Sequence, residues 1–503
     1  MVELARKRSL PAMNQLTALL VTTAALLAPA VRAQAPVPQN GEFVVSTSGG
    51  RPDVAMTTSG EFVTVWNEGP IKARSYHADG MPATGPFAVS EATEAQFLPA
   101  VATDGAGVTT VVWSDGRTAA TRLVMRRFDA ARMPLGPTVP FSASTGQNNQ
   151  AYARVAANAA GEVVATWADG ITLSFPGDVY ARRVAPDGFF RTGDLAANTR
   201  RPYYQSHPDA AIDAAGNAVV VWQDDNRNVN TDPDQFDVLM QRYGPTGAAV
   251  GGETRVNTTL TGAQFYPAVA MNPGGTFTAV WLGAGPQGGG VILQHFDASG
   301  ARRGGEVRVN VTPALSYRPG VVLGARGDAV VVWARADGRV VLRRIDRDGA
   351  AASGEVLVGT TALWAGPFGT LGPPDINVAS NDAGALVVVW MGTDLGSYGQ
   401  RFALAPVAGE ALPEAPAALA VSVAPVPAGA SGATVRYTLA AAGEARVTVV
   451  DALGREVAVL ADGAAAAGAH DVRMATAGLP SGVYAVRVEA GGAVTVVRVP
   501  VVQ

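Results

Sequence analysis

Seven of the eight tryptophans recur at intervals of 47 to 59 residues, and this repeat constrains the fold more than any other feature of the chain. A glycine stands six residues before each of them, and eleven residues before stands an alanine or, once, a valine. The seven are Trp66, Trp113, Trp167, Trp222, Trp281, Trp333 and Trp390. A register that holds over seven units predicts one supersecondary unit repeated seven times.

Each unit has the pattern of four short strands. An extended run such as 99–102 precedes a glycine turn, and a second apolar run such as 219–222 ends at the tryptophan. After a variable loop, a third run ends in arginine and an apolar residue, as in Arg344-Ile345, and a fourth follows, as in 306–310. Glycine supplies the positive φ of tight hairpins, and β-branched residues suit a pleated, half-buried surface. We therefore expect each unit to be a four-stranded meander.

Seven meanders of this length predict a seven-bladed β-propeller over residues 41–404, with each tryptophan filling the space between blades. The seventh unit lacks its fourth strand, whereas residues 41–46 resemble that strand and precede the first unit. An N-terminal strand that completes the last blade would close the ring and remove its open edges. An open β-solenoid is the alternative, but it would not explain this offset.

The composition agrees with an all-β chain and narrows its chemistry. Charged residues make up only 16%, and 58 glycines and 33 prolines suit many short strands. Because there is no cysteine, disulfides, thiolate metal sites and cysteine nucleophiles are excluded. The net charge of −4 and the lack of a basic patch make nucleic acid an improbable partner.

The first 33 residues have the pattern of a signal peptide. Basic residues at 6–8 precede an apolar run at 16–30 and the sequence Val31-Arg32-Ala33, so we expect cleavage after Ala33. The apolar run is short for a bilayer span, and no later segment is apolar enough to be one, so the mature chain is expected to have no transmembrane segment.

A second β-domain is expected after the propeller. Residues 405–430 are rich in alanine and proline and are interpreted as an extended linker. From residue 431 to 503, short runs alternate with period two, which predicts a small immunoglobulin-like β-sandwich.

Two resemblances follow from these patterns. Residues 41–404 resemble a loose group of secreted bacterial propeller repeats through Trp222-Gln-Asp224 with Asp237-Val238, a likeness that implies fold and little about function. The C-terminal segment resembles the type A sorting domain of the type IX secretion system through Val449-Val-Asp-Ala-Leu-Gly-Arg-Glu-Val457, Gly468-Ala-His-Asp-Val472 and Leu479-Pro-Ser-Gly-Val-Tyr484.

The sorting motif residues of the second resemblance are Leu479, Pro480, Gly482 and Tyr484. The resemblance implies export by the type IX machinery to the cell surface or the medium. The last strand departs from the commonest pattern, since it carries only Arg498 and is interrupted by Pro500. An ordinary structural β-domain is the alternative.

Aromatic residues recur in the segments that lead from one repeat into the next, on the face that also carries the loops after the tryptophans. The candidate ligand-face aromatics are Phe97, Tyr152, Tyr203, Tyr204, Phe265, Tyr266, Tyr317 and Trp364. Aromatic faces stack on sugar rings, so these residues suggest a polysaccharide site. The alternative is that they only pack the rim of each blade.

Carboxylates recur two residues after the tryptophan, at Glu68, Asp115, Asp169 and Asp224. They could bind a cation or act as an acid and base pair on a glycoside, although capping of their own loops is the favoured interpretation. The acidic loop 224–234 resembles a calcium loop without its central glycine and distal glutamate, so calcium is the one cofactor for which a candidate exists.

No local catalytic motif is present, which leaves the function open. No His-x-x-x-His, Gly-x-Ser-x-Gly, phosphate-loop or sialidase Asp-box pattern occurs. The hypothesis is a non-enzymatic surface binding or adhesion protein that engages polysaccharide or another surface polymer. A secreted carbohydrate-active hydrolase or lyase, and a structural envelope protein, are the alternatives.

Overall fold

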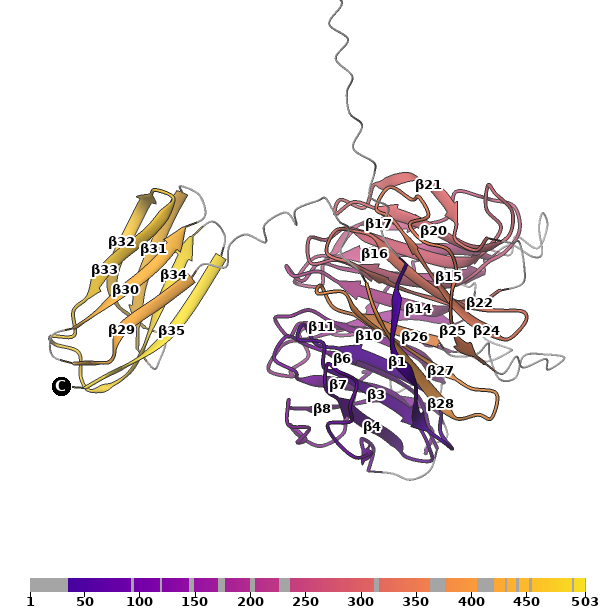
Figure 1. The fold of residues 1–503 in the computed structure, drawn as a ribbon, viewed down its shortest axis with the longest axis horizontal. Helices are drawn as coiled ribbons and strands as arrows, with labels where there is room; N and C mark the ends of the chain where they lie inside the picture. The colour runs from indigo at the N-terminus through magenta and orange to yellow at the C-terminus, as the bar shows by residue number, and fades with distance from the viewer. Residues whose placement is uncertain are drawn as a thin grey trace, which may run out of the picture. The chain divides into compact units, whose positions relative to one another are not determined.

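The computed structural model contains two compact units, residues 1–408 and 409–503. It describes residues 35–91, 95–117, 120–143, 149–170, 177–199, 204–225, 236–311, 316–361, 376–404, 420–429, 432–439, 443–451, 455–490 and 493–502. Every regular element in these ranges is a β-strand (Figure 1). None of them contains a helix that is long and apolar enough to span a membrane.

The first unit is the predicted seven-bladed β-propeller, with seven four-stranded sheets in its described residues. The blades, in chain order, are β2 (Gly50–Met56), β3 (Phe62–Asn67), β4 (Ile71–Tyr76) and β5 (Phe87–Ala88); β6 (Gln96–Thr103), β7 (Thr109–Asp115), β8 (Arg122–Phe128) and β9 (Val139–Pro140); β10 (Gln150–Ala157), β11 (Val163–Asp169), β12 (Asp178–Val184) and β13 (Leu195–Ala196); β14 (Gln205–Ile212), β15 (Ala218–Asp225), β16 (Phe236–Tyr243) and β17 (Ala249–Arg255); β18 (Gln264–Met271), β19 (Phe277–Gly283), β20 (Gly290–Phe296) and β21 (Arg302–Arg308); β22 (Ser316–Leu323), β23 (Ala329–Arg335), β24 (Arg339–Ile345) and β25 (Val356–Thr360); and β26 (Ile376–Ser380), β27 (Ala385–Met391), β28 (Ser397–Ala403) and β1 (Val37–Ser46).

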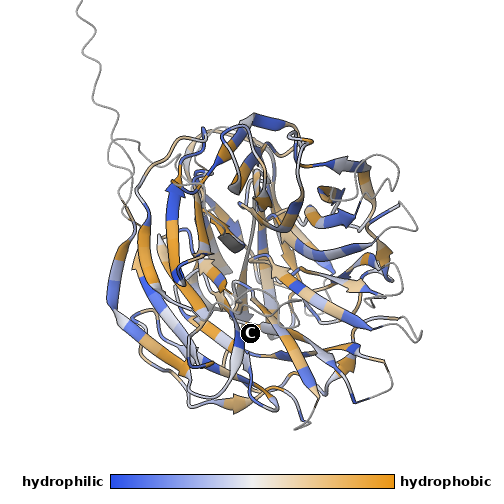
Figure 2. Cartoon of the chain, turned by 90° about the vertical axis from the view of Figure 1, so that its right-hand side faces the viewer, coloured by the Kyte–Doolittle hydropathy of each residue, from blue (hydrophilic) through white to orange (hydrophobic). Residues whose placement is uncertain are grey.

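The first strands of the repeats line the axis of the ring. Each of them contacts the first strand of the next blade, from β2 through β26, and β26 returns to β2. Apolar and hydrophilic stretches are interspersed along the strands (Figure 2). All seven tryptophans are at most 1% exposed, and Trp281 of the fifth blade packs on Val219 and Val238 of the fourth. The tryptophans therefore fill the space between blades, as the sequence predicts.

The N-terminal strand closes the ring. β1 pairs antiparallel with β28, and the pairs include Val37 with Ala403 and Val44 with Tyr398. The strand begins at Val37, four residues earlier than expected, and its register shifts between Gln39 and Phe43. The last blade thus takes its outermost strand from the other end of the propeller, which confirms the predicted closure.

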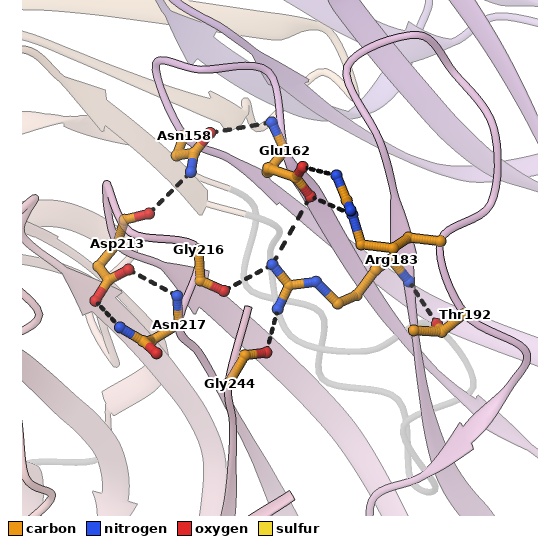
Figure 3. A network of polar contacts seen from close by, with 9 residues as sticks. Asn158, Glu162, Arg183, Thr192, Asp213, Gly216, Asn217 and Gly244 are labelled. Atoms are coloured by element: carbon orange, nitrogen blue, oxygen red, sulfur yellow. Dashed lines mark hydrogen bonds and ion pairs between the residues drawn. The ribbon is translucent and has the colours of Figure 1, made fainter. Parts of the chain in front are cut away.

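Arginines near the ends of third strands hold neighbouring blades together. Arg183 on β12 is 1% exposed and donates hydrogen bonds to the carbonyl oxygens of Gly244, at 2.9 Å, and Gly216, at 2.7 Å, in the next blade (Figure 3). Its guanidinium also lies 3.9 Å from the carboxylate of Glu162. Arg401 makes the same kind of bond to the carbonyls of Ala78 and Asp79 across the closure. We call this repeated contact the arginine clasp.

The second unit is a β-sandwich, as predicted. Its strands are β29 (Ala420–Gly429), β30 (Gly432–Leu439), β31 (Gly443–Val450), β32 (Glu456–Ala465), β33 (Gly468–Met474), β34 (Gly482–Ala490) and β35 (Ala493–Val501). β29, β30 and β33 form one layer and β32, β31, β34 and β35 the other, and the layers join at Ala428 and Val501. Buried residues of both layers, such as Val435 and Val486, form one core.

The linker ends earlier than expected, because Ala420–Gly429 is strand β29 and not part of an extended connection. Pro425 and Pro427 made this segment resemble a linker. They lie between Ala424 and Gly429, where the pairing of β29 with β30 is interrupted, so they remove no hydrogen bond from the ladder.

Candidate functional site

In the part of the chain that the structure describes, a β-bulge in the first strand of six blades shapes the axial end of the ring. In β10, for example, Ala151 pairs with Ala168 and Arg154 with Thr166, so two residues lie opposite Trp167 alone. The same two-against-one arrangement recurs in β2, β6, β14, β18 and β22, each time opposite the tryptophan. A bulge bends the strand and redirects side chains, and bulges are enriched next to functional sites.

The first residue of the bulge has a left-handed backbone in five blades. The residues are Arg51, Leu98, Tyr152, His207 and Tyr266, with φ between 50° and 56°. This region costs a non-glycine residue about 1–3 kcal/mol, and such residues persist where the surrounding structure imposes them. A proline follows in five of the six bulged strands, where its missing N–H does not weaken the sheet.

Three of these bulges bring aromatic rings into contact across consecutive blades. The rings of Tyr152 and His207 stack with their centroids 4.2 Å apart. The rings of His207 and Tyr266 meet edge to face at 4.8 Å. The guanidinium of Arg318, from the next bulge, lies 5.9 Å from the centroid of Tyr266. Blades three to six therefore contribute one continuous row, which we call the axial arc.

The axial arc borders a cavity of about 170 Å³. His207, Tyr266 and Arg318 line it together with Arg154, Asp209 and Asp53. Pockets for drug-sized ligands occupy roughly 300–1,000 Å³, so this cavity suits one small group, such as a single sugar ring.

Burial controls the charge of the cavity side chains. Desolvation, assisted by the positive charges of Arg318 and Arg154, lowers the pKa of His207 well below its usual value, so its ring is neutral at pH 7. Desolvation raises the pKa of Asp209 to about 6, although Arg154 opposes this shift.

Both acidic residues of the cavity hold the inner strands together. Asp209 accepts hydrogen bonds from the amides of Ala210, at 2.9 Å, and Val269 of the next blade, at 2.8 Å. Asp53 accepts the equivalent bonds from Val54 and Val101, both at 2.9 Å. Since both oxygens of each carboxylate accept a backbone hydrogen bond, the main role of Asp53 and Asp209 is to connect neighbouring blades.

The polar atoms of the axial arc, by contrast, point to a ligand. Among the described residues, the hydroxyls of Tyr152 and Tyr266 have no hydrogen-bond partner, and His207 is bonded only through Nδ1, 3.0 Å from Ser206 Oγ. The backbone amide of Tyr266 is fixed by Gln223 Oε1 at 3.3 Å. The rings are held while their polar atoms stay available.

The sequence-predicted aromatics fall into three groups. Tyr152 and Tyr266 belong to the axial arc. Tyr204 lies close enough to both for their phenols to influence it. Burial, these two phenols and Asp225 together raise the pKa of Tyr204 to about 12. Phe265 packs on Phe236 with centroids 5.0 Å apart, and Phe97 is 45% exposed. Tyr203 and Trp364 lie outside the described residues, and the structure describes only the backbone of Tyr317.

The sequence reasoning did not single out His207, Arg154, Arg318, Asp53 and Asp209. A signal for them existed, because His207 and Arg318 stand in the slot fifteen residues before the tryptophan that holds tyrosine in two other repeats. A proline follows each of them, so the slot marks the bulge.

The carboxylates after the tryptophans form internal hydrogen bonds. Asp115, Asp169 and Asp224 each accept a bond from a glutamine seventeen residues before the tryptophan, at 3.0, 3.0 and 2.6 Å. Burial would raise the pKa of Glu68, but hydrogen bonds from Trp66, Lys72 and Ser46 outweigh it and lower the pKa to about 2. These groups are thus tied to their own blades more extensively than loop capping alone would require.

The calcium candidate falls mostly outside the described residues, which include only Asp224 and Asp225 of that loop. In the part of the chain that the structure describes, no group of three or more histidine or acidic side chains is arranged to hold a metal ion.

The residues predicted to form the sorting motif have a local structural role in the second unit. Tyr484 at the start of β34 is 8% exposed, and its hydroxyl donates a hydrogen bond to the carbonyl of Pro480 at 3.0 Å. The amide of Leu479 bonds the carbonyl of Thr476 at 3.0 Å. Gly482 begins the strand. A buried tyrosine that reaches back to the preceding turn stabilises a sandwich corner.

Comparisons with known proteins find similarity of fold. No protein-family model and no curated protein matches the chain. Similar solved structures include an α-L-arabinanase of Penicillium chrysogenum, at 12% identity and a TM-score of 0.43, covering 62% of this chain and 94% of that one. The polysaccharide lyase Uly1 has 12% identity and a TM-score of 0.44, covering 75% and 95%. A protein of unknown function from Dyadobacter fermentans has 11% identity and a TM-score of 0.40, covering 75% and 100%.

Proposed function

We propose that the propeller is an extracellular polysaccharide-binding module whose axial arc holds one sugar unit of the polymer. The supporting observation is the row of Tyr152, His207 and Tyr266 beside a small cavity, with phenol and imidazole atoms that lack partners among the described residues. Sugar rings present an apolar face and a rim of hydroxyls. Aromatic rings with free polar atoms at their edges complement both.

A hydrolase that uses a pair of carboxylates is less well supported. Glycoside hydrolysis requires two carboxyl groups available to the substrate. Asp53 and Asp209 instead bond backbone amides of two blades, and Asp115 and Asp169 bond glutamines of their own blades.

Binding of the mature chain, residues 34–503, to immobilised polysaccharides tests this function. We expect retention on some members of a panel of bacterial, algal and plant polymers. Tyr152→Ala and Tyr266→Ala should each weaken binding about tenfold, or ~1.4 kcal/mol, because each removes one stacking ring. Phe189→Ala is the matched control, since Phe189 is 76% exposed and lies in the turn between β12 and β13. Absence of binding across the panel would rule the proposal out.

We further propose that the signal peptide and the C-terminal sandwich direct the chain to the outer surface through the type IX machinery. The resemblance of residues 449–484 to the sorting domain supports this route. Fractionation of cells that produce the chain without the whole sandwich, residues 420–503, should then find it in the periplasm. Surface delivery of the truncated chain would contradict the proposal.

A further inference from the structure

The cavity beside the axial arc contains more kinds of polar and charged group than sugar stacking requires. Binding through stacking needs aromatic faces alone, whereas this cavity is lined by an imidazole, one phenol and two guanidinium groups. Among the described residues, the Arg154 side chain donates one hydrogen bond, to the carbonyl of Ala153 at 3.3 Å, so most of its N–H groups remain for a ligand. Arg318 lies at the other end of the arc.

Two arginines in one cavity favour an anionic sugar. The guanidinium group recognises a carboxylate through paired hydrogen bonds. The negative charges of Asp53 and Asp209 are already directed at backbone amides. A uronate, whose carboxylate stands on the carbon next to the ring oxygen, is the sugar that fits this charge pattern.

We propose that the axial cavity is the active site of a lyase that cleaves uronate-containing polysaccharide by β-elimination, with His207 as base and Tyr266 as acid. This inference rests on the proposed polysaccharide binding and assigns the substrate class and the reaction to the same site.

The elimination is redox-neutral and consumes no water. His207 Nε2 removes the proton from C5, the electron pair of that C–H bond forms the C4=C5 double bond, and the bond from C4 to its glycosidic oxygen breaks. The phenol of Tyr266 gives its proton to the departing oxygen. Solvent then returns a proton to the phenolate and takes one from the imidazolium.

The geometry provides each role. When Nδ1 donates its hydrogen to Ser206 Oγ, at 3.0 Å, Nε2 holds the lone pair that a base needs. Arg318 stabilises the phenolate that Tyr266 becomes, because the guanidinium lies 5.9 Å from that ring. Arg154 and Arg318 also stabilise the negative charge that develops on the uronate carboxylate when C5 loses its proton.

Substrate binding would also improve the base. Burial and the positive charges of Arg318 and Arg154 lower the pKa of His207 in the free protein. A bound carboxylate compensates those charges, so it raises the pKa of His207 and strengthens the imidazole as a base only when substrate is present.

The test measures turnover and binding together on the mature chain. The probes are polygalacturonate, alginate and glucuronan, each beside the same polymer with its carboxyl groups reduced to alcohols. Elimination creates an unsaturated uronate that absorbs in the ultraviolet, whereas hydrolysis creates only reducing ends. We expect absorbance to rise with at least one uronate polymer and with none of the reduced polymers.

Variants assign the roles. His207→Ala and Tyr266→Phe should lower kcat at least 100-fold while binding persists, since general acid and base groups contribute about 10²- to 10⁴-fold. Arg154→Gln should raise KM about tenfold. The controls are His77→Ala and Tyr398→Phe, because His77 lies in an exposed turn and Tyr398 bonds Asp394 on the seventh blade.

The outcomes separate the two proposals. Binding of uronate polymers without any elimination overturns the lyase and leaves the binding function standing. Elimination that survives His207→Ala and Tyr266→Phe also overturns this assignment, as does the release of reducing ends without absorbance. Failure to bind any polymer overturns both proposals.

Discussion

Residues two positions apart on the inner strands have different roles. The first residue of the bulge, as in His207, leaves the ladder and faces the axial cavity, while Asp209, two residues later, bonds its own strand and the next. Arg154 and Asp53 are the other charged groups that influence Asp209. Site and scaffold are thus interleaved within three residues.

Asp209 predicts a pH dependence of stability. Because its pKa is raised to about 6 in the folded protein, the folded state binds this proton more tightly than the unfolded chain, whose carboxyl has a pKa of 3.8. Wild type should therefore gain stability relative to Asp209→Asn as pH falls from 7 to 4, by about 2 kcal/mol. Urea unfolding of both proteins at several pH values measures the difference, and His207 titrates in both and cancels. A difference that is constant with pH would contradict the assignment.

The site could be predicted only in part from such residues. Tyr152, Tyr204 and Tyr266 were identified because aromatic rings recur before the repeats. His207, Arg154 and Arg318 were missed because a bulge inserts one residue into a period of two, so alternation assigns their side chains to the wrong face. The cavity combines aromatic, arginine and aspartate side chains from different blades. Their proximity follows from the closure of the propeller, which the sequence of a single repeat does not reveal.

At the scale of elements, the arginine clasp joins the third strands of the second, third and seventh blades to turns of the next blade, through Arg127, Arg183 and Arg401. Histidine replaces arginine in the fifth blade, where His295 Nε2 lies 3.1 Å from the carbonyl of Asp346. Burial lowers the pKa of His295, and Thr278 Oγ1 lies 2.7 Å from its Nδ1. A neutral ring with both nitrogens engaged can thus substitute for a guanidinium.

Loss of one clasp should destabilise the propeller. Arg183→Ala leaves the buried carbonyls of Gly216 and Gly244 without their donor, so we expect the free energy of unfolding to fall by about 2–4 kcal/mol. Arg339→Ala is the control, because its side chain is 58% exposed and its ion pair should contribute less than about 1 kcal/mol. Equal unfolding midpoints for the two variants would show that the clasp does not contribute to the stability of the propeller.

The strands themselves were largely predictable, and the two misplaced boundaries share one cause. The start of β1 at Val37 and the whole of β29 contain prolines, which argue against strands in a sequence. In the structure Pro425 and Pro427 fall at an irregularity of pairing. Tertiary contacts decide whether such a segment joins a sheet.

At the scale of the whole molecule, closure links residues more than 300 positions apart. Ser397 Oγ donates to the carbonyl of Gly49 at 2.5 Å, and Asn377 Nδ2 donates to the carbonyl of Pro52 at 2.7 Å. We expect contacts at such separations to form late in folding, since they close long loops before they gain any interaction. The last blade therefore depends on the first strand of the chain.

Removal of residues 35–46 should open this blade. β28 would lose its partner, and its exposed edge would invite association between molecules. We expect a lower unfolding temperature and concentration-dependent oligomers in light scattering. Deletion of residues 420–503 is the control, since it removes every strand of the sandwich and leaves all seven blades intact. A monomer that unfolds like the parent chain would show that closure does not need β1.

Because Val37 pairs with Ala403, the propeller begins and ends on neighbouring strands, and the order of its blades is cyclic. A gene that joined these two positions and opened the chain between other blades would encode the same contacts as a circular permutant. The present starting point is then one of seven equivalent choices for the architecture. Evolution could change it without altering the axial residues, so related propellers can share a site while their sequences start in different blades.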